Sequence, residues 1–456
     1  MASRRFFDRL RRRGLRGAPG RPALDLAPGL PERDARRVHD VITELLSLHD
    51  TMTQRAEAAA VADAYLALSD DGRHNFLRML AQDFWTDHRM VDDAVDALES
   101  TRSKDAGAGT DADRRTAERR LRDALVPPAD RLLRLFTGLE DGVKFLVDLR
   151  ADVLRVASTD TALGDLDREL KAQLATLFDV GLLTLRRITW EAPAALLEKL
   201  IAYEAVHAIS SWDDLKNRLD SDRRCYAFFH PAMPNEPLVF VEIALTVGMA
   251  TELPPLLDAR APDLDLDRAD TAVFYSISNC QPGLAGVNLG TALIKQVVEA
   301  LSLHLPRLRR FVTLSPIPGF RSWVERELGT DGAALRAGER ELLPAEPGRV
   351  LARLSDRGWD VDEAIRPALL ALCARYLTTT TEGRASDPVA NFHLANGATV
   401  ERVNWMADSS PTGRARSFGL MANYLYEPDH IPERAEAYAS RGTVPVSGEV
   451  RDLIAQ

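Results

Sequence analysis

The sequence predicts an α+β multidomain protein in which an all-α helical bundle precedes a mixed α/β domain. Two observations lead to this prediction: apolar residues recur at helical spacing in the first half, and short apolar strands alternate with helices in the second. A chain of 456 residues, 45% hydrophobic and 28% charged, has the length and composition of a folded protein of two or three domains. We expect a basic tail over residues 1–32, the helical domain over 33–190 and the α/β domain over 191–456.

The N-terminal tail is rich in arginine and poor in acidic residues. Phe6, Phe7 and Leu10 stand among the arginines, which is also the pattern of an organelle transit peptide or a membrane-surface helix. We favour a disordered basic tail, because the sequence GAPGRPA at residues 17–23 interrupts any helix. Since no apolar run reaches the length of a membrane-spanning helix, we expect no stable membrane anchor.

From Arg33 to about Ile188 the chain consists mainly of Ala, Leu, Arg, Asp and Glu, with apolar residues at helical spacing. Phe76, Met79 and Leu80 are one such group. Stripes of this kind on charged helices predict amphipathic helices that pack on one another. The most loop-like stretch is Ser103–Ala112, and we expect no catalytic residue in this half.

After a predicted helix over Pro193–Ala208, short apolar strands alternate with helices. The run LVFVEIALTV at residues 238–247 is apolar on both faces, as expected of a strand in the middle of a sheet. We expect helices at Gly290–His304, Val361–Leu377 and about Ser417–Tyr426, and strands at Cys225–Phe229, Leu238–Thr246, Ala272–Ile277, Phe311–Leu314, around Ala390–His393, and at Val400–Trp405.

The composition argues against several classes of function. A net charge of −10 does not suit a general nucleic-acid binder, whose affinity depends on Lys and Arg against phosphates. The three cysteines, Cys225, Cys280 and Cys373, are scattered and indicate reduced thiols rather than a disulfide framework. The nine histidines have no metal-ligand spacing, so we predict no metal site.

A strand, a glycine turn and a helix follow one another over residues 271–304. Glycine lets the backbone pass close to a phosphate, and the N–H groups at a helix start bind anions. The turn is neither a P-loop nor a GxGxxG fingerprint, but it resembles a degenerate pyrophosphate loop of GNAT-type acyl-CoA-dependent acyltransferases. The candidate CoA-binding loop is Ala285, Gly286, Val287, Asn288, Leu289, Gly290 and Thr291. The same pattern also occurs in turns that bind no ligand.

Two further segments contain candidate catalytic residues. In FVTLSPIPGF, Ser315 leaves an apolar strand where two prolines end it, so its hydroxyl either faces a cleft or caps the turn. In NFHLANGATVERVNWMAD, His393 lies in a predicted short strand and is either a core residue or a catalyst. Together they would make a Ser/His pair, but spacing alone does not bring them into contact.

These segments closely resemble malonyl-CoA decarboxylases. The resemblance rests on YSISNCQPGLAGVNLGTALIK, TLSPIPGF and NFHLANGATVERVNWMAD, in that order, and extends from about Ile188 to Ala437. It implies a GNAT-like catalytic domain after a helical oligomerisation domain, with Ser315 and His393 as catalytic residues and Ala285–Thr291 as the CoA loop. Several relatives have Glu where this chain has Asn288, which makes any charge-dependent role of that position doubtful here. We expect Tyr424 and Asn404 to have a packing role rather than a catalytic one.

The resemblance further implies that the protein converts malonyl-CoA to acetyl-CoA and carbon dioxide, through an enolate that is protonated at C2. No metal or organic cofactor is expected, and CoA is not counted as one because it is part of the substrate. The alternatives are a GNAT-type acyltransferase, which would need an acceptor, and a malonyl-CoA sensor without turnover. We expect a homo-oligomer, dimer or tetramer, through the helical domain, and a cytoplasmic protein because the Ala- and Arg-rich composition is typical of a high-GC bacterium.

Overall fold

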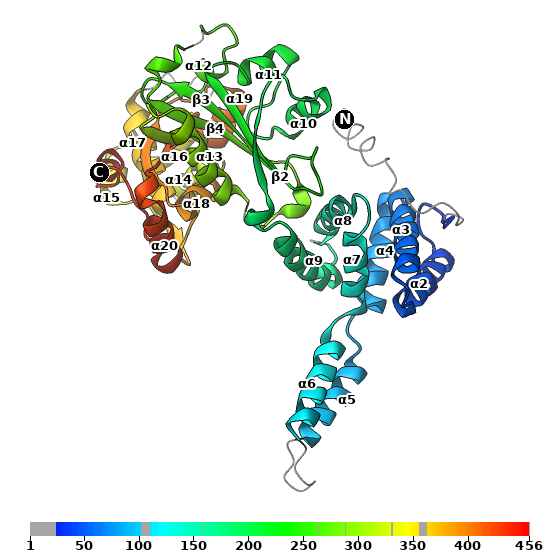
Figure 1. The fold of residues 1–456 in the computed structure, drawn as a ribbon. Coiled ribbons are helices and arrows are strands. Elements are labelled where there is room, and N and C mark those ends of the chain that lie inside the picture. Colours follow the sequence, from blue (N-terminus) through cyan, green and yellow to red (C-terminus); the bar gives the residue numbers. More distant parts are fainter. Residues whose placement is uncertain are drawn as a thin grey trace. The chain divides into compact units, whose positions relative to one another are not determined.

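The computed structural model describes residues 24–101, 110–157, 159–262, 264–287, 289–329, 332–354 and 363–455. These residues form two compact units, shown as ribbons in Figure 1. The helical unit contains the described residues of Met1–Leu183, His230–Glu236 and Gln281–Asn288. The sheet unit contains those of Thr184–Phe229, Pro237–Cys280 and Leu289–Gln456.

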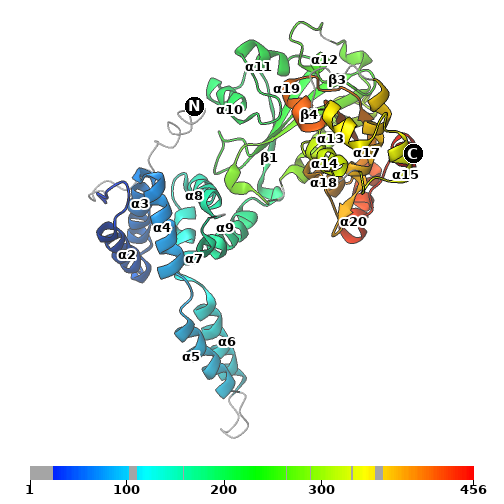
Figure 2. The ribbon, with the colours of Figure 1, turned by 180° about the vertical axis from the view of Figure 1, so that it is seen from behind.

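The helical unit consists of α-helices joined by short turns, as the apolar spacing predicts. Within it, the hairpin of α5 and α6 extends away from the other helices, and Figure 2 shows this from the opposite side. The helices are α2 (Glu32–Ser47), α3 (Thr51–Ala67), α4 (Asp70–Asp83), α5 (His88–Ser100), α6 (Asp111–Leu125), α7 (Pro128–Thr137), α8 (Gly142–Val156) and α9 (Gly164–Leu177), with 3₁₀ turns at Thr161–Leu163, Val180–Leu182 and Pro282–Leu284.

Aromatic side chains fill the core of the helical unit. Tyr65, Phe76, Phe136 and Phe145 are all buried and meet edge to face, with ring centroids 5.0–5.7 Å apart. Burial of each large apolar side chain contributes about 1.5–3 kcal/mol, so this cluster is a main source of the unit's stability. The predicted tail is described only from residue 24, and there Leu30 is buried against the bundle. Residues 1–23 lie outside the described residues.

The sheet unit is built on an eight-stranded sheet of the described residues. Its order is β1-β2-β3-β4-β5-β10-β6, with β9 on β10, and every pair is antiparallel except the parallel pair β4–β5. The strands are β1 (Thr184–Ile188), β2 (Arg223–Phe229), β3 (Val239–Thr246), β4 (Thr271–Asn279), β5 (Arg310–Thr313), β6 (Ser315–Pro316), β9 (Thr399–Asn404) and β10 (Met421–Tyr426); β7 (Thr380–Thr381) and β8 (Arg384–Ala385) form a separate pair.

Helices cover this sheet. Leu196, Leu197 and Leu200 of α10 pack with Leu215 of α11 on apolar residues of β1, β2 and β3, and α12 packs with residues of β3, β4 and β5. The helices are α10 (Ala194–Tyr203), α11 (Trp212–Arg218), α12 (Pro254–Leu257), α13 (Gly290–His304), α14 (Phe320–Gly329), α15 (Ala337–Glu341), α16 (Pro347–Leu354), α17 (Arg366–Thr378), α18 (Pro388–Ala395), α19 (Pro411–Ser417), α20 (Ile431–Arg441) and α21 (Gly448–Ala455).

Most predicted elements of this unit are confirmed, and α13 has the predicted bounds of Gly290–His304. The helix predicted over Pro193–Ala208 is shorter, at Ala194–Tyr203. Of the helix predicted over Val361–Leu377, the first two residues lie outside the described residues, and α17 covers Arg366–Thr378. Most of the loop predicted over Ser103–Ala112 also lies outside them.

Two predicted elements are wrong. The expected strand around Ala390–His393 is the helix α18, because Asp387 caps its N-terminus and Pro388 occupies its first position. The expected helix over Ser417–Tyr426 is mainly the strand β10, because α19 already ends at Ser417, where the next residue adopts a left-handed conformation. No helix of the described residues is long and apolar enough to cross a membrane.

Candidate active site

The structure brings Ser315 and His393 into contact in the sheet unit. Ser315 lies in the two-residue strand β6, where Pro316 and Pro318 end the strand, and His393 lies in the second turn of α18. The Oγ atom of Ser315 is 3.0 Å from Nε2 of His393, although the two residues are 78 positions apart. Both are buried, with 6% and 2% of their surface exposed. This is the Ser–His contact that spacing alone did not establish.

Hydrogen bonds continue on both sides of this pair. Ser315 Oγ donates to Thr313 Oγ1 at 2.8 Å, and the Tyr426 hydroxyl lies 2.7 Å from Nδ1 of His393. If Ser315 donates to Thr313, it accepts from an Nε2–H, and Nδ1 then accepts the proton of Tyr426. The arrangement therefore selects the Nε2–H tautomer of a neutral imidazole.

Burial keeps His393 uncharged. Desolvation lowers the pKa of His393 from its ordinary value of 6.5 to about 3, because the imidazolium loses its hydration in the interior. The ring of Tyr424 stacks on the imidazole with centroids 4.4 Å apart, and the Tyr424 hydroxyl is buried with no hydrogen-bond partner among the described residues. The interior around the Ser–His pair is thus apolar, so a charged group of a bound ligand would interact with the pair more strongly than it would in water.

Asn404 and Asn423 support the end of β5. Asn404 Nδ2 donates to Asn423 Oδ1 at 2.7 Å, and Asn423 Nδ2 donates to the Thr313 carbonyl at 2.7 Å. The Tyr424 N–H also donates to Thr313 Oγ1, at 3.1 Å. Asn404 is therefore connected, through Asn423, to the backbone of Thr313, whose side chain hydrogen-bonds Ser315.

The predicted CoA loop is described except at Asn288, and the Thr291 side chain is also outside the description. Ala285, Gly286 and Val287 belong to the helical unit, whereas Leu289 and Gly290 belong to the sheet unit. Gly286 has a φ of +75°, a left-handed conformation that glycine adopts without strain. Leu289 is buried and directly precedes α13, and the first-turn N–H groups of a helix have no partner within the helix itself.

Two cations of the helical unit contact the first part of this loop. Arg150 of α8, which is only 2% exposed, donates from Nη1 to the carbonyls of Gly283 and Ala285 at 2.7 and 2.8 Å. The Lys171 Nζ lies 2.9 Å from the position that a Cβ of Gly286 would occupy. Both cations therefore lie beside the first part of the predicted loop, within the helical unit.

Close packing is a further reason for glycine at position 290. A Cβ at this position would lie 2.5 Å from Cε2 of Phe392, the neighbour of His393. The start of α13 thus packs directly on the phenyl ring that precedes the catalytic candidate. The glycine allows helix and ring to approach, in addition to any role toward a phosphate.

Sequence reasoning missed Thr313, Tyr426, Arg150 and Lys171. Thr313 precedes Ser315 by two residues, so strand alternation places both side chains on one face, and that signal was available. Tyr426 lay in a segment predicted as helix, which hid its pairing with β5. Arg150 and Lys171 look like residues of a solvated helix face, and no local pattern distinguishes them.

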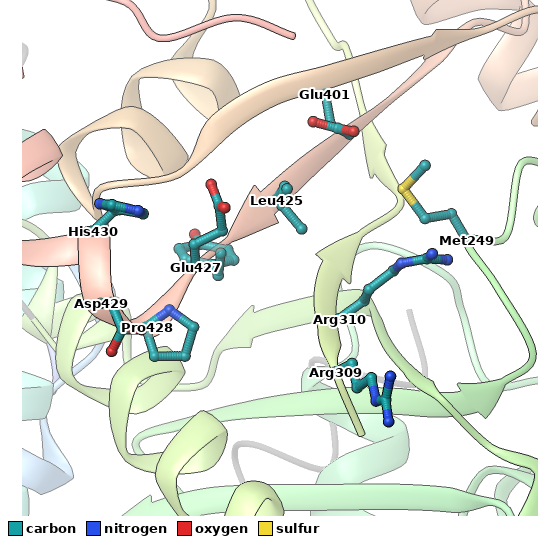
Figure 3. A pocket seen from close by; sticks show the side chains of 10 residues that line it. Met249, Arg309, Arg310, Glu401, Leu425, Glu427, Pro428, Asp429 and His430 are labelled. Atoms are coloured by element: carbon teal, nitrogen blue, oxygen red, sulfur yellow. The ribbon is translucent and has the colours of Figure 1, made fainter. Parts of the chain in front are cut away.

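A pocket of about 540 Å³ lies elsewhere on the sheet unit, beside the start of β5 and the end of β10. Figure 3 shows Arg309 and Arg310 on one side of it, with Glu427, Asp429 and His430 opposite. Tyr426, the hydrogen-bond partner of His393, lines this pocket, but neither Ser315 nor His393 does. Among the described residues, no group of His, Cys, Asp or Glu could hold a metal ion.

The fold and the site define an enzyme with a helical unit, a mixed-sheet unit and a buried, hydrogen-bonded Ser–His pair. Family models agree on a more specific class: the malonyl-CoA decarboxylase C-terminal domain matches residues 181–456, and the N-terminal domain of the same family matches residues 84–178. The mitochondrial malonyl-CoA decarboxylase of Rattus norvegicus is 38% identical over 408 residues, 84% of this chain and 82% of its own length. That of Anser anser anser is 33% identical over 98% of this chain and 94% of its own.

Solved structures give the same result. The malonyl-CoA decarboxylases of Rhodopseudomonas palustris and Agrobacterium vitis each superpose with a TM-score of 0.82 and 38% identity. Each match covers 92% of this chain, with 99% and 100% of the respective relative. The chain therefore belongs to the malonyl-CoA decarboxylase family.

Proposed function

We propose that this protein converts malonyl-CoA to acetyl-CoA and carbon dioxide. The observation that carries the proposal is the 3.0 Å contact between Ser315 Oγ and His393 Nε2, in a chain whose relatives are named malonyl-CoA decarboxylases. An acyltransferase would need a second substrate to accept the acyl group, and a sensor would not need the buried pair. The decarboxylase accounts for both the family and the geometry.

The reaction makes three demands on the site. The bond between C2 and the carboxylate carbon breaks, carbon dioxide leaves, and the electron pair passes into a thioester enolate. One proton then adds to C2. The enzyme must hold the carboxylate out of the thioester plane, stabilise the enolate oxygen and supply that proton. A donor aimed at the developing oxyanion contributes about 10²- to 10³-fold, and a positioned acid about 10²- to 10⁴-fold.

Ser315 and His393 can meet these demands together. In the resting site His393 is neutral, since burial lowers its pKa to about 3. A substrate carboxylate within about 4–6 Å favours the imidazolium, so His393 takes up a proton when malonyl-CoA binds. It then passes this proton to C2, directly or through Ser315, while the Ser315 hydroxyl hydrogen-bonds the carboxylate or the thioester.

The CoA pyrophosphate binds on the loop Ala285–Thr291 in this proposal. Within the sheet unit, the helix start at Gly290 supports that assignment, because the first-turn N–H groups and the dipole of a helix favour an anion. The domain that contains the Ser–His pair would have a GNAT-like fold. Neither a metal nor an organic cofactor has a role in these steps.

The experiment incubates purified protein with malonyl-CoA, without acceptor and with EDTA, and follows acyl-CoA species by mass spectrometry. Rapid formation of acetyl-CoA is expected. Ser315→Ala and His393→Asn should each lower kcat by about 10²-fold or more, with CoA affinity little changed. Ser440→Ala, an exposed hydroxyl on α20, is the matched control and should keep full activity. Intact malonyl-CoA despite measurable binding would refute the decarboxylase, and added amines would then test for acyl transfer.

Assembly and location are part of the same proposal. We expect a dimer or tetramer through the helical unit, which light scattering after gel filtration measures directly. Removal of the α5–α6 hairpin tests whether that element takes part. We place the protein in the cytoplasm, although its animal relatives are named mitochondrial. An N-terminus trimmed within the Arg-rich segment in protein from its own cells would indicate import instead.

A further inference from the structure

Asp387 lies between the two segments that carry the Ser–His pair. Its side chain is fully buried, at 0% exposure. One carboxylate oxygen, Oδ1, accepts the N–H groups of Val389 and Ala390, both at 2.9 Å, and so caps the N-terminus of α18. His393 lies one turn further along this eight-residue helix. The direction in which α18 leaves Asp387 therefore sets where His393 stands.

The same carboxylate faces the segment that follows Ser315. The N–H of Gly319, four residues after Ser315, and the hydroxyl of Tyr376 on α17 both act to lower the pKa of this carboxyl. They also lie close to each other, because a Cβ at Gly319 would be 2.3 Å from the Tyr376 hydroxyl oxygen. Burial raises the pKa of the Asp387 carboxyl, and the hydrogen-bonding groups around it oppose that rise. Oδ2 has no hydrogen-bond partner of ordinary geometry in the described part of the chain, so the contacts to Gly319 and Tyr376 are looser than the cap.

We infer that Asp387 is a positioning residue, which fixes the distance between Ser315 and His393 by joining the start of α18 to the turn at Gly319. It touches neither member of the pair. Its effect on catalysis rests on the proposed decarboxylase function, whereas its effect on the geometry of the pair does not. A misplacement of about 1 Å in a catalytic group can cost about 10²-fold in rate, so a loose junction would lower kcat rather than KM.

Two substitutions at Asp387 distinguish its role as the N-cap of α18 from its contact with the turn at Gly319. Asn caps a helix about as well as Asp, so Asp387→Asn should keep the melting temperature of the protein. Its amide would present N–H groups toward the Gly319 N–H, which also donates, and the joining contact would be lost. We expect kcat to fall about 10-fold with KM unchanged. Asp387→Ala loses both contacts, and we expect a lower melting temperature and a kcat about 10²-fold lower.

Gly319 offers an independent test that leaves Asp387 in place. A Cβ at Gly319 would clash with the hydroxyl oxygen of Tyr376, whereas the Tyr376 Cζ atom would lie at 3.5 Å, an ordinary contact. Gly319→Ala should therefore open the junction and lower kcat about 10-fold. Adding Tyr376→Phe removes the clashing oxygen, so the double variant should return to the kcat of Tyr376→Phe alone.

A control and a second measurement complete the design. Ser211→Ala removes the N-cap of α11, which packs on β2 far along the sheet order from β6, and should lower the melting temperature with kcat unchanged. Histidine NMR, with the His393 signal assigned from the His393→Asn variant, reads the imidazole without any activity. Its Nε2 and Nδ1 shifts should change in Asp387→Asn and Gly319→Ala but not in Ser211→Ala. Wild-type shifts and wild-type kcat in Asp387→Asn would overturn the inference. Absence of decarboxylation by wild-type protein would refute only the proposed function.

Discussion

Replacing His393 should make the protein more resistant to mild acid. Burial lowers the pKa of this histidine to about 3 in the folded protein, against 6.5 when it is exposed. Between these two values the unfolded chain binds a proton that the folded chain does not bind, so unfolding is favoured as the pH falls. The stability lost in this window is fully present above pH 6.5. His393→Asn has no such proton to bind in either state.

The magnitude follows from the two pKa values. Linkage over one site with pKa values of 6.5 and about 3 gives a loss of about 2 kcal/mol between pH 7 and pH 5. This is a large share of the about 5–15 kcal/mol by which proteins of ordinary stability are folded. Other groups also titrate in this range, but they are shared by wild type and variant and cancel in the comparison.

The assay is urea unfolding followed by tryptophan fluorescence at pH 7 and at pH 5. The wild type should lose about 2 kcal/mol more than His393→Asn between the two pH values. Ser315→Ala keeps the buried histidine and serves as the matched control, so it should behave like the wild type. Equal losses in wild type and His393→Asn would show that the histidine is charged or exposed in the folded protein, and the reasoning about the site would fail.

Three further predictions concern other contacts. Tyr426→Phe removes the hydroxyl that hydrogen-bonds Nδ1 of His393. It should lower kcat about 10-fold in the acetyl-CoA assay, which corresponds to the free energy of about one buried hydrogen bond. Arg150→Gln loosens the carbonyls of the predicted CoA loop and should raise KM with kcat little changed. Arg218→Met leaves the buried Glu242 side chain, whose pKa burial already raises to about 8, without its partner, and should destabilise the protein by about 3–5 kcal/mol in urea unfolding.

Each of these has an outcome that contradicts it. A Tyr426→Phe enzyme with the kcat of the wild type would mean that Nδ1 needs no donor during turnover. If Arg150→Gln changed only the melting temperature, the arginine would be purely structural. Adding Glu242→Leu to Arg218→Met removes the isolated charge and should restore most of the stability. A double variant as unstable as Arg218→Met alone would show that packing, not charge, is responsible.

Much of the fold follows from local sequence, because periodicity and chain-breaking residues act locally. The helical half and α13 are examples, since glycine at 290 and the apolar stripe after it define the helix without tertiary information. The errors at α18 and β10 have a common cause. Both segments are apolar and short, and in such segments capping residues and left-handed turns decide between helix and strand.

The site was only partly predictable for a different reason. Ser315 and His393 could be identified by their unusual sequence context and by family resemblance, but their contact depends on β10, which joins distant parts of the chain. Tyr426 acts through a hydrogen bond that has no sequence signature. The contacts of Arg150 are even harder to predict, because its partners are backbone carbonyls 133 and 135 residues away in the sequence.

The position of β10 between β5 and β6 has a consequence for how the protein is made. Among the described residues, the strand of Ser315 pairs within the sheet with β10 alone, and β10 is synthesised more than 100 residues later. Translation proceeds at about 5–20 residues per second. The Ser315 segment of the nascent chain therefore remains unpaired for several seconds. The edge of β5 is exposed for the same interval and can pair with other chains. We therefore expect newly made protein to depend on chaperones until β10 has been synthesised and paired.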